Sequence, residues 1–118
     1  MIKNDRYQIP GLTCTIDGEA RPVVNLSVGG LFVESGEPLL LGQSVTALLR
    51  VGEGVAFEVT AKVIWINDKA RPRVGHLPPG FGMKILRMRF RDRMEILRVL
   101  GETGIRAHRA GAGEQPAA

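Results

Sequence analysis

The residues best suited to bind a ligand lie together in one short polar stretch, Asn-Leu-Ser-Val-Gly-Gly at positions 25–30. In an extended segment the side chains of Asn25 and Ser27 point the same way, while the residues between and after them point toward a core. Asn and Ser can hydrogen-bond to an anion or to the edge of a base, and Gly29 and Gly30 let another group approach the backbone closely. The stretch is therefore compatible with a ligand site. A turn that these side chains merely tie down is an equally good interpretation.

Catalytic and metal-binding patterns are missing from the sequence. His76 and His108 have no partner at metal-ligand spacing, and Cys14 is the only cysteine, so no intramolecular disulfide can form. Ser27 has neither a neighbouring base nor a nucleophile elbow around it. The Gly-Phe-Gly run at 80–82 lacks the third glycine of a dinucleotide fingerprint. We therefore expect no enzymatic activity, no catalytic residue, no metal and no cofactor.

Size and charge narrow the classes of protein further. A chain of 118 residues with 44% apolar residues fits one domain with a real core. Its formal charge of +4 and pI of 9.8 favour an anionic partner. No charged-then-apolar leader opens the chain, and Glu58 and Lys62 interrupt the longest apolar-rich stretch, residues 55–66. We expect a cytoplasmic protein without membrane insertion.

The elements that must position the polar stretch are mostly strands. Alternating apolar and polar residues between turn signals predict about six of them, at 12–16, 21–26, 31–34, 44–51, 55–66 and 82–88. Apolar residues then recur at helical spacing, at Phe90, Met94, Leu97 and Leu100, and Gly101 would end that helix. The prediction is a mainly β fold, a small six-stranded antiparallel barrel with one C-terminal helix, over residues 1–102. The composition of residues 103–118 predicts a disordered tail.

The alternation also assigns side chains to faces. In the strand at 55–66, Trp65 is in phase with Ala61 and Val63, which places all three in the barrel core. Cys14 alternates inward on its strand and is expected to be a small core residue. Residues 67–80 form a long break of the kind that is usually functional or mobile.

The polar stretch and its surroundings resemble the PilZ domain family. Asn25-x-Ser27-x-x-Gly30 matches the family's [D/N]-x-S-x-x-G motif, and the segments NLSVGGLFV, EPLLLGQSV, AKVIWIN and PPGFGMKIL follow the family's order over roughly residues 5–102. The resemblance implies a six-stranded antiparallel β-barrel with a C-terminal helix. It also implies bacterial signalling, in which many members bind cyclic di-GMP and act on motility, adhesion or polysaccharide output.

In that family a second segment, R-x-x-x-R before the first strand, also holds the dinucleotide. Arginine can pair bidentately with phosphate or with the guanine edge. Here only Arg6 is available: its partner position holds Ile2, or, in the other alignment, Asn4 and Gln8 hold both positions. Loss of one bidentate contact weakens binding roughly 5- to 150-fold. The ligand-binding residues that the resemblance implies are Arg6, Asn25, Ser27, Gly29 and Gly30, and we expect the polar side chains to face solvent at the barrel rim.

Three functions stay open at this point. The first is a PilZ-domain effector that binds cyclic di-GMP. The second is a PilZ-type interaction module that has lost the ligand and contacts a protein of the motility or secretion machinery. The third is a small-barrel nucleic-acid binder that uses the arginines at 87, 89, 91 and 93, although this basic stripe would break up where the helix begins near Phe90.

Overall fold

The computed structural model describes residues 6–27, 29–37, 39–54, 56–103 and 105–106 of the chain. In chain order, the elements within these residues are β1 (Tyr7–Gln8), β2 (Leu12–Ile16), β3 (Glu19–Leu26), β4 (Gly30–Glu34), β5 (Ser44–Val51), β6 (Ala56–Asn67), β7 (Gly80–Met88), α1 (Phe90–Thr103) and β8 (Ile105–Arg106).

Six of the strands close into an antiparallel barrel, as the sequence predicts. They pair in the order β2-β5-β6-β7-β4-β3, and β3 pairs back onto β2. The Asp17-Gly18 turn makes the β2–β3 connection tight, since both residues adopt positive φ, 52° and 79°. The two-residue strands β1 and β8 are additional: β1 pairs with β3 on one side and with β8 on the other.

The barrel interior is mostly aliphatic, with Phe57 and Phe81 among its buried side chains. Cys14, Leu49 and Val63 are fully buried in it, so the prediction of an inward-facing Cys14 is confirmed. Burial raises the pKa of the Cys14 thiol to about 12, with a smaller opposing effect from the charge on Arg21.

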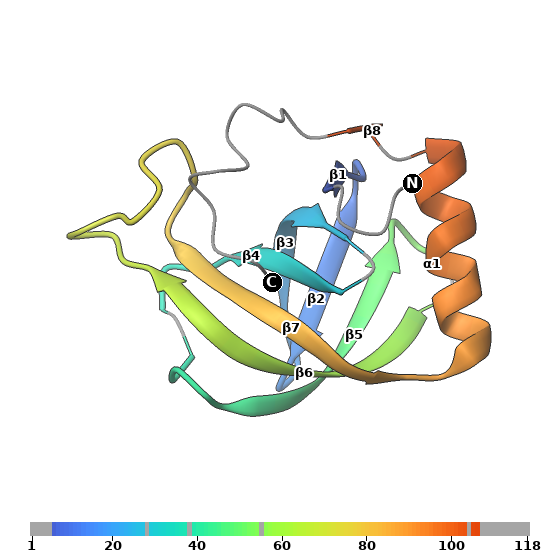
Figure 1. The fold of residues 1–118 in the computed structure, drawn as a ribbon, viewed down its shortest axis with the longest axis horizontal. Helices are drawn as coiled ribbons and strands as arrows, with labels where there is room; N and C mark the ends of the chain where they lie inside the picture. The colour runs from blue at the N-terminus through green and yellow to red at the C-terminus, as the bar shows by residue number, and fades with distance from the viewer. Residues whose placement is uncertain (1–5, 28, 38, 55, 104, 107–118) are drawn as a thin grey trace.

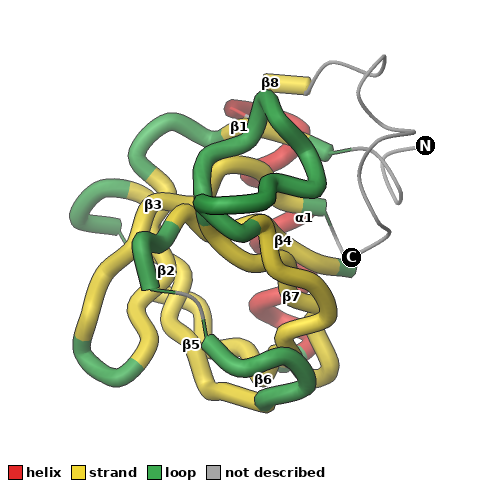
Figure 2. The backbone as a smooth tube through the Cα atoms, turned by 90° about the vertical axis from the view of Figure 1, so that its left-hand side faces the viewer, coloured by secondary structure: helices red, strands yellow, loops and turns green. Residues whose placement is uncertain are grey.

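The helix α1 packs across one end of the barrel. Its residues Ile96 and Val99 line a small apolar cavity together with Leu12, Leu49 and Phe57 from the strands. Figure 1 shows α1 at the right-hand end of the barrel and the loop between β6 and β7 at the opposite end. Figure 2 looks into the barrel from the loop end, with α1 on the far side.

A β-bulge in β6 overturns the expected position of Trp65. Val63 pairs with Met83, but Trp65 pairs with Gly82, so Ile64 is an extra residue on β6. The bulge moves Trp65 out of phase with Val63. Trp65 is buried as expected, yet it lies on the outer face of the barrel instead of in its core.

A second bulge acts in the same way on β3. Val23 pairs with Val33, but Asn25 pairs with Phe32, so Val24 is the extra residue. Val23 stays in the barrel core, whereas Val24 packs against the outer cluster. The bulge therefore turns both Val24 and Asn25 to the outer face.

An outer apolar cluster results from these two bulges. Its buried members are Phe32, Trp65 and Val74, and the rings of Phe32 and Trp65 stack with their centroids 5.0 Å apart. Val74 belongs to the loop between β6 and β7. The guanidinium of Arg73, from the same loop, lies 5.6 Å from the Trp65 ring centroid, within cation–π range.

The long loop is anchored by one buried side chain, Asn67. Its Nδ2 donates to the carbonyls of Val74, Leu77 and Pro78 at 3.1–3.2 Å, and its Oδ1 accepts from the Val74 amide at 3.0 Å. This loop was expected to be functional or mobile. The structure gives it a packing role, because it covers the outer cluster.

The predicted helix is present, but it runs past Gly101 to Thr103. Gly101 does not adopt the left-handed φ of a helix C-cap. Phe90 and Met94 are exposed, and Ile96 is buried in their place. Residues that we expected in a disordered tail also differ, since Thr103 ends α1 and β8 follows it. The rest of that tail, residues 107–118, lies outside the described residues.

Candidate functional site

The hairpin between β3 and β4 carries the motif. The Ser27 amide donates to the Gly30 carbonyl at 2.8 Å, and the Ser27 hydroxyl lies 3.3 Å from the same oxygen. The Gly29 amide donates to Ser27 Oγ at 3.3 Å, and the Gly29 carbonyl accepts from the Ile85 amide on β7. Ser27 thus ties down its own turn, while the turn is fixed to the barrel wall.

Arg6 lies over this turn. Pairing of Tyr7 with Leu26 joins β1 to β3 and brings the preceding residue to the hairpin. Arg6 Nη1 is 3.5 Å from Ser27 Oγ and 3.4 Å from the Gly30 carbonyl oxygen. Burial lowers the pKa of the Arg6 guanidinium by desolvation. The structure therefore brings together the arginine before the first strand and the serine and glycine of the motif.

The expectation that the polar side chains face solvent is wrong in this structure. Asn25 is only 3% exposed and Ser27 only 4%. Ser27 is buried because its own turn and Arg6 surround its hydroxyl, and Asn25 because the β3 bulge places it opposite Phe32 on the face of the outer cluster. Asn25 Oδ1 is buried and, within the described part of the chain, has no hydrogen-bond partner. Gly29 is exposed and Gly30 is buried.

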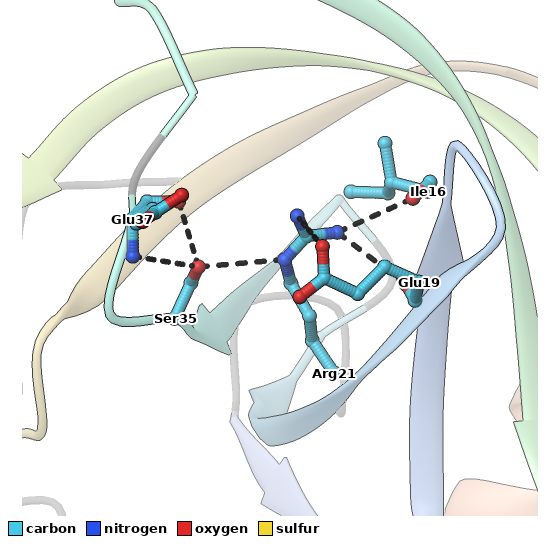
Figure 3. A network of polar contacts seen from close by, with 5 residues as sticks. All are labelled: Ile16, Glu19, Arg21, Ser35 and Glu37. Carbon is cyan, nitrogen blue, oxygen red and sulfur yellow. Dashed lines mark hydrogen bonds and ion pairs between the residues drawn. The ribbon is translucent and has the colours of Figure 1, made fainter.

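A polar network around Arg21 is a feature that the sequence did not suggest (Figure 3). Arg21 Nε donates to Ser35 Oγ at 3.4 Å, and Nη1 donates to the carbonyls of Ile16 and Glu19, both at 3.4 Å. Nη2 pairs with the Glu19 carboxylate at 3.2 Å, and Ser35 is bonded in turn to the backbone of Glu37. These bonds tie the β2–β3 turn to the end of β4. A single arginine on a short strand carries no pattern that would have revealed this role.

The arginine stripe breaks up as expected. Arg87 lies on β7, whereas Arg91 and Arg93 lie on α1, so alternate arginines no longer share a face. Arg89 between them pairs with the buried carboxylate of Asp92 at 3.0 Å.

The described ranges hold neither a metal cluster nor a membrane-spanning helix. No three His, Cys, Asp or Glu side chains among those residues gather closely enough to hold a metal ion. None of the helical segments placed by the structure has the length and apolar character to cross a bilayer.

The fold is that of a small β-barrel module. Its six-stranded barrel is closed, a helix packs across one end, and Arg6 lies on the polar β3–β4 hairpin. The sequence model of the PilZ domain matches residues 4–102, and the chain belongs to this family. PilZ domains are regulatory, non-catalytic modules.

Comparison with solved structures agrees with the fold. The structure of Bacillus subtilis Inhibitor of motility (MotI/DgrA) superposes with a TM-score of 0.55 at 18% sequence identity. The match covers 85% of this chain and 49% of that one, so the chain spans about half the length of its neighbour. At this identity the likeness shows the fold alone. No curated protein matches the sequence significantly.

Proposed function

We propose that this PilZ domain is a signalling effector that binds cyclic di-GMP at the β3–β4 hairpin. The proposed site residues are Arg6, Asn25, Ser27, Gly29 and Gly30. The observation that carries the proposal is the contact of Arg6 Nη1 with Ser27 Oγ and the Gly30 carbonyl, at 3.5 and 3.4 Å. Two segments far apart in the sequence, both of the kind that hold the ligand in this family, meet at one point.

The charge balance at this point supports an anionic ligand. The Arg6 side chain is half-buried, its guanidinium is partly desolvated, and among the described residues it has no carboxylate partner. A desolvated charge without a counter-charge is unfavourable. The phosphates of cyclic di-GMP would supply the missing negative charge, with the bidentate geometry that arginine favours.

The hydrogen-bond balance supports a guanine as well. An unpaired buried acceptor costs about 1–3 kcal/mol, and Asn25 Oδ1 is such an acceptor among the residues placed by the structure. A guanine edge offers N–H donors that would pair with it. The Arg6 guanidinium and Asn25 Oδ1 would then both gain partners from the same dinucleotide.

Binding requires the N-terminal segment to move, because Arg6 covers the hydroxyl of Ser27. In the proposed mechanism Arg6 leaves the turn, takes hold of the ligand and orders its segment across the barrel mouth. The surface shown to a partner protein changes as a result. We propose motility, adhesion or polysaccharide machinery in the cytoplasm as the output.

A second function, an adaptor that does not bind the nucleotide, is favoured by two observations. The family's other arginine position holds Ile2 or, in the alternative alignment, Asn4. In addition, Ser27 is already hydrogen-bonded by the protein's own arginine and turn. In this function the partner surface is presented constitutively.

Titration calorimetry separates the two functions. For the effector we expect heat with a micromolar midpoint for cyclic di-GMP and none for cyclic di-AMP at the same concentrations. Arg6→Ala and Ser27→Ala should each weaken binding at least several-fold, whereas Arg50→Ala, which removes an exposed arginine on β5, should leave it unchanged. If no heat is measured up to about a millimolar cyclic di-GMP, the adaptor function is supported instead. An unchanged titration in both site variants would exclude the assigned site.

A further inference from the structure

The helix α1 has two apolar faces, and only one of them packs against the barrel. Ile96, 3% exposed, and Val99 face the core. On the opposite side Phe90 is 77% exposed and Met94 is 49% exposed. Large exposed apolar side chains in a group commonly mark an interaction surface.

The exposed residues Phe90, Met94 and Gly101, with the half-buried Leu97 between them, follow the spacing of a helix–helix seam. Phe90, Met94, Leu97 and Gly101 are separated by four, three and four residues, the a/d spacing of a coiled coil. The row is about 16 Å long, or three turns. Gly101 ends it with open space within 4 Å of a built Cβ, so that a facing backbone could approach closely. Figure 1 shows α1 at the edge of the molecule, with no other labelled element beyond it.

Arginines flank this seam on both sides. Arg91 and Arg98 take the position that follows each d residue, and Arg93 takes the position that precedes Met94, which are the e and g positions of the same pattern. Arg91 and Arg93 are exposed and, within the residues that the structure places, have no carboxylate partner. Arg98 pairs with Glu95 one turn earlier.

We propose that this face of α1, defined by Phe90, Met94, Leu97 and Gly101, docks one helix of a partner protein, and that acidic residues flank the apolar seam of that helix. Residues at e and g select partners by charge. A second copy of the chain would bring arginine against arginine, which disfavours self-association. A lipid surface is a poorer occupant, because the stripe is narrower than the 100° or more of an apolar face that lies flat on a larger surface. The docking face does not depend on whether the β3–β4 hairpin binds a nucleotide.

Two synthetic peptides test the proposal with the full chain. Both are three-heptad helices with Leu and Ile at a and d, and they differ only in carrying Glu or Lys at every e and g position. By fluorescence anisotropy we expect the Glu peptide to bind at least tenfold more tightly than the Lys peptide. The affinity for the Glu peptide should fall as salt is raised.

Three variants assign the binding to this face. Phe90→Ala should weaken binding of the Glu peptide at least fivefold. Leu40→Ala is the matched control, because Leu40 is also 77% exposed but lies outside α1, and it should have no effect. The double charge reversal Arg91→Glu with Arg93→Glu should reverse the preference toward the Lys peptide. Circular dichroism confirms that each variant is folded.

Several outcomes would overturn the proposal. Equal affinity for the two peptides, no binding up to about a millimolar, or the same loss in Leu40→Ala would each contradict it. Concentration-dependent dimerisation abolished by Phe90→Ala would assign the face to a second copy. Sedimentation with phosphatidylglycerol vesicles abolished by the same variant would assign it to a membrane.

Discussion

The indole of Trp65 lies directly over the α-carbon of Gly82, its partner on β7. A Cβ built on Gly82 would fall 1.9 Å from Trp65 Nε1 and 2.4 Å from Cδ1. The same glycine pairs with Phe32 on β4, whose ring stacks on the indole. Gly82 therefore leaves the space in which two aromatic rings from opposite neighbours meet on the outside of the barrel.

Gly82→Ala should destabilise the protein by about 1–3 kcal/mol, the usual cost of overpacking. The Trp65 ring cannot easily retreat, since it stacks on Phe32 within a buried cluster that includes Val74. Urea denaturation followed by Trp65 fluorescence measures the change. Gly36→Ala is the control, because nothing lies within 4 Å of its built Cβ, and it should change stability by less than about 0.5 kcal/mol. Equal effects of the two substitutions would contradict the contact.

Asn67→Asp should release the loop between β6 and β7. The substitution replaces an amide that donates to three carbonyls with an oxygen that repels them. We expect faster hydrogen exchange at the Val74 amide and lower stability at pH 7. Because burial beside carbonyls raises the pKa of the new carboxyl, stability should recover as the pH falls and the group is protonated. Asp68→Asn, an exposed neighbour, serves as the control, and a loop equally protected in both variants would exclude the anchor.

Arg21→Met should cost about 1–2 kcal/mol through loss of its hydrogen bonds to Ser35 and the Ile16 carbonyl. The Arg21 side chain is only 11% exposed, whereas that of Glu19 is 73% exposed. Glu19→Gln should therefore cost less than about 0.5 kcal/mol, as for other surface ion pairs. Chemical denaturation measures both variants, and a cycle of Arg21→Met, Ser35→Ala and the double variant gives the coupling energy between Arg21 and Ser35. A larger effect of Glu19→Gln would show that the surface ion pair matters more than the buried bonds.

The buried thiol of Cys14 should make the free energy of unfolding decrease as the pH becomes alkaline. Its thiol pKa is raised to about 12 in the folded state, compared with about 8.5 in an unfolded chain. The unfolded state thus loses its proton first, and the stabilisation present below about pH 8.5 is lost as the pH rises toward 12, by about 1.4 kcal/mol per pH unit. Urea denaturation at pH 8 and pH 10.5 should show a steeper loss for the wild type than for Cys14→Ala. Parallel losses in the two proteins would disprove the shift.

The barrel was predictable from the sequence because its strands alternate cleanly. The range Leu12–Ile16 was predicted to the residue, and the Asp17-Gly18 turn has the backbone that its residue types favour. The two bulges were not predictable, since neither Val24 nor Ile64 differs in type from an ordinary strand residue. Each bulge inserts one residue and reverses the face on which the next residues of its strand lie. Trp65 was assigned to the wrong side for that reason.

The candidate site was predictable only in part. The polar stretch was singled out by its residue types and Arg6 by the resemblance to the PilZ family, and the structure places Arg6 against Ser27 and Gly30. The burial of Asn25 follows from the bulge at Val24, and the strand that positions Arg6 is two residues long, too short for any periodic signal. The apolar residues of α1 had two possible inward faces. The choice of Ile96 over Phe90 depends on the shape of the barrel end, which no local pattern encodes.

The pairing of β1 with β8 has a practical consequence for anyone who trims this chain. Tyr7 and Gln8 lie opposite Arg106 and Ile105. The residues after α1 therefore pair with β1, the strand that follows Arg6. A protein that ended with α1 would leave one edge of β1 unpaired and would hold the adjacent Arg6 less rigidly. Ligand affinities measured on such a shortened domain would therefore describe a protein in which Arg6 is held less rigidly than in the longer chain.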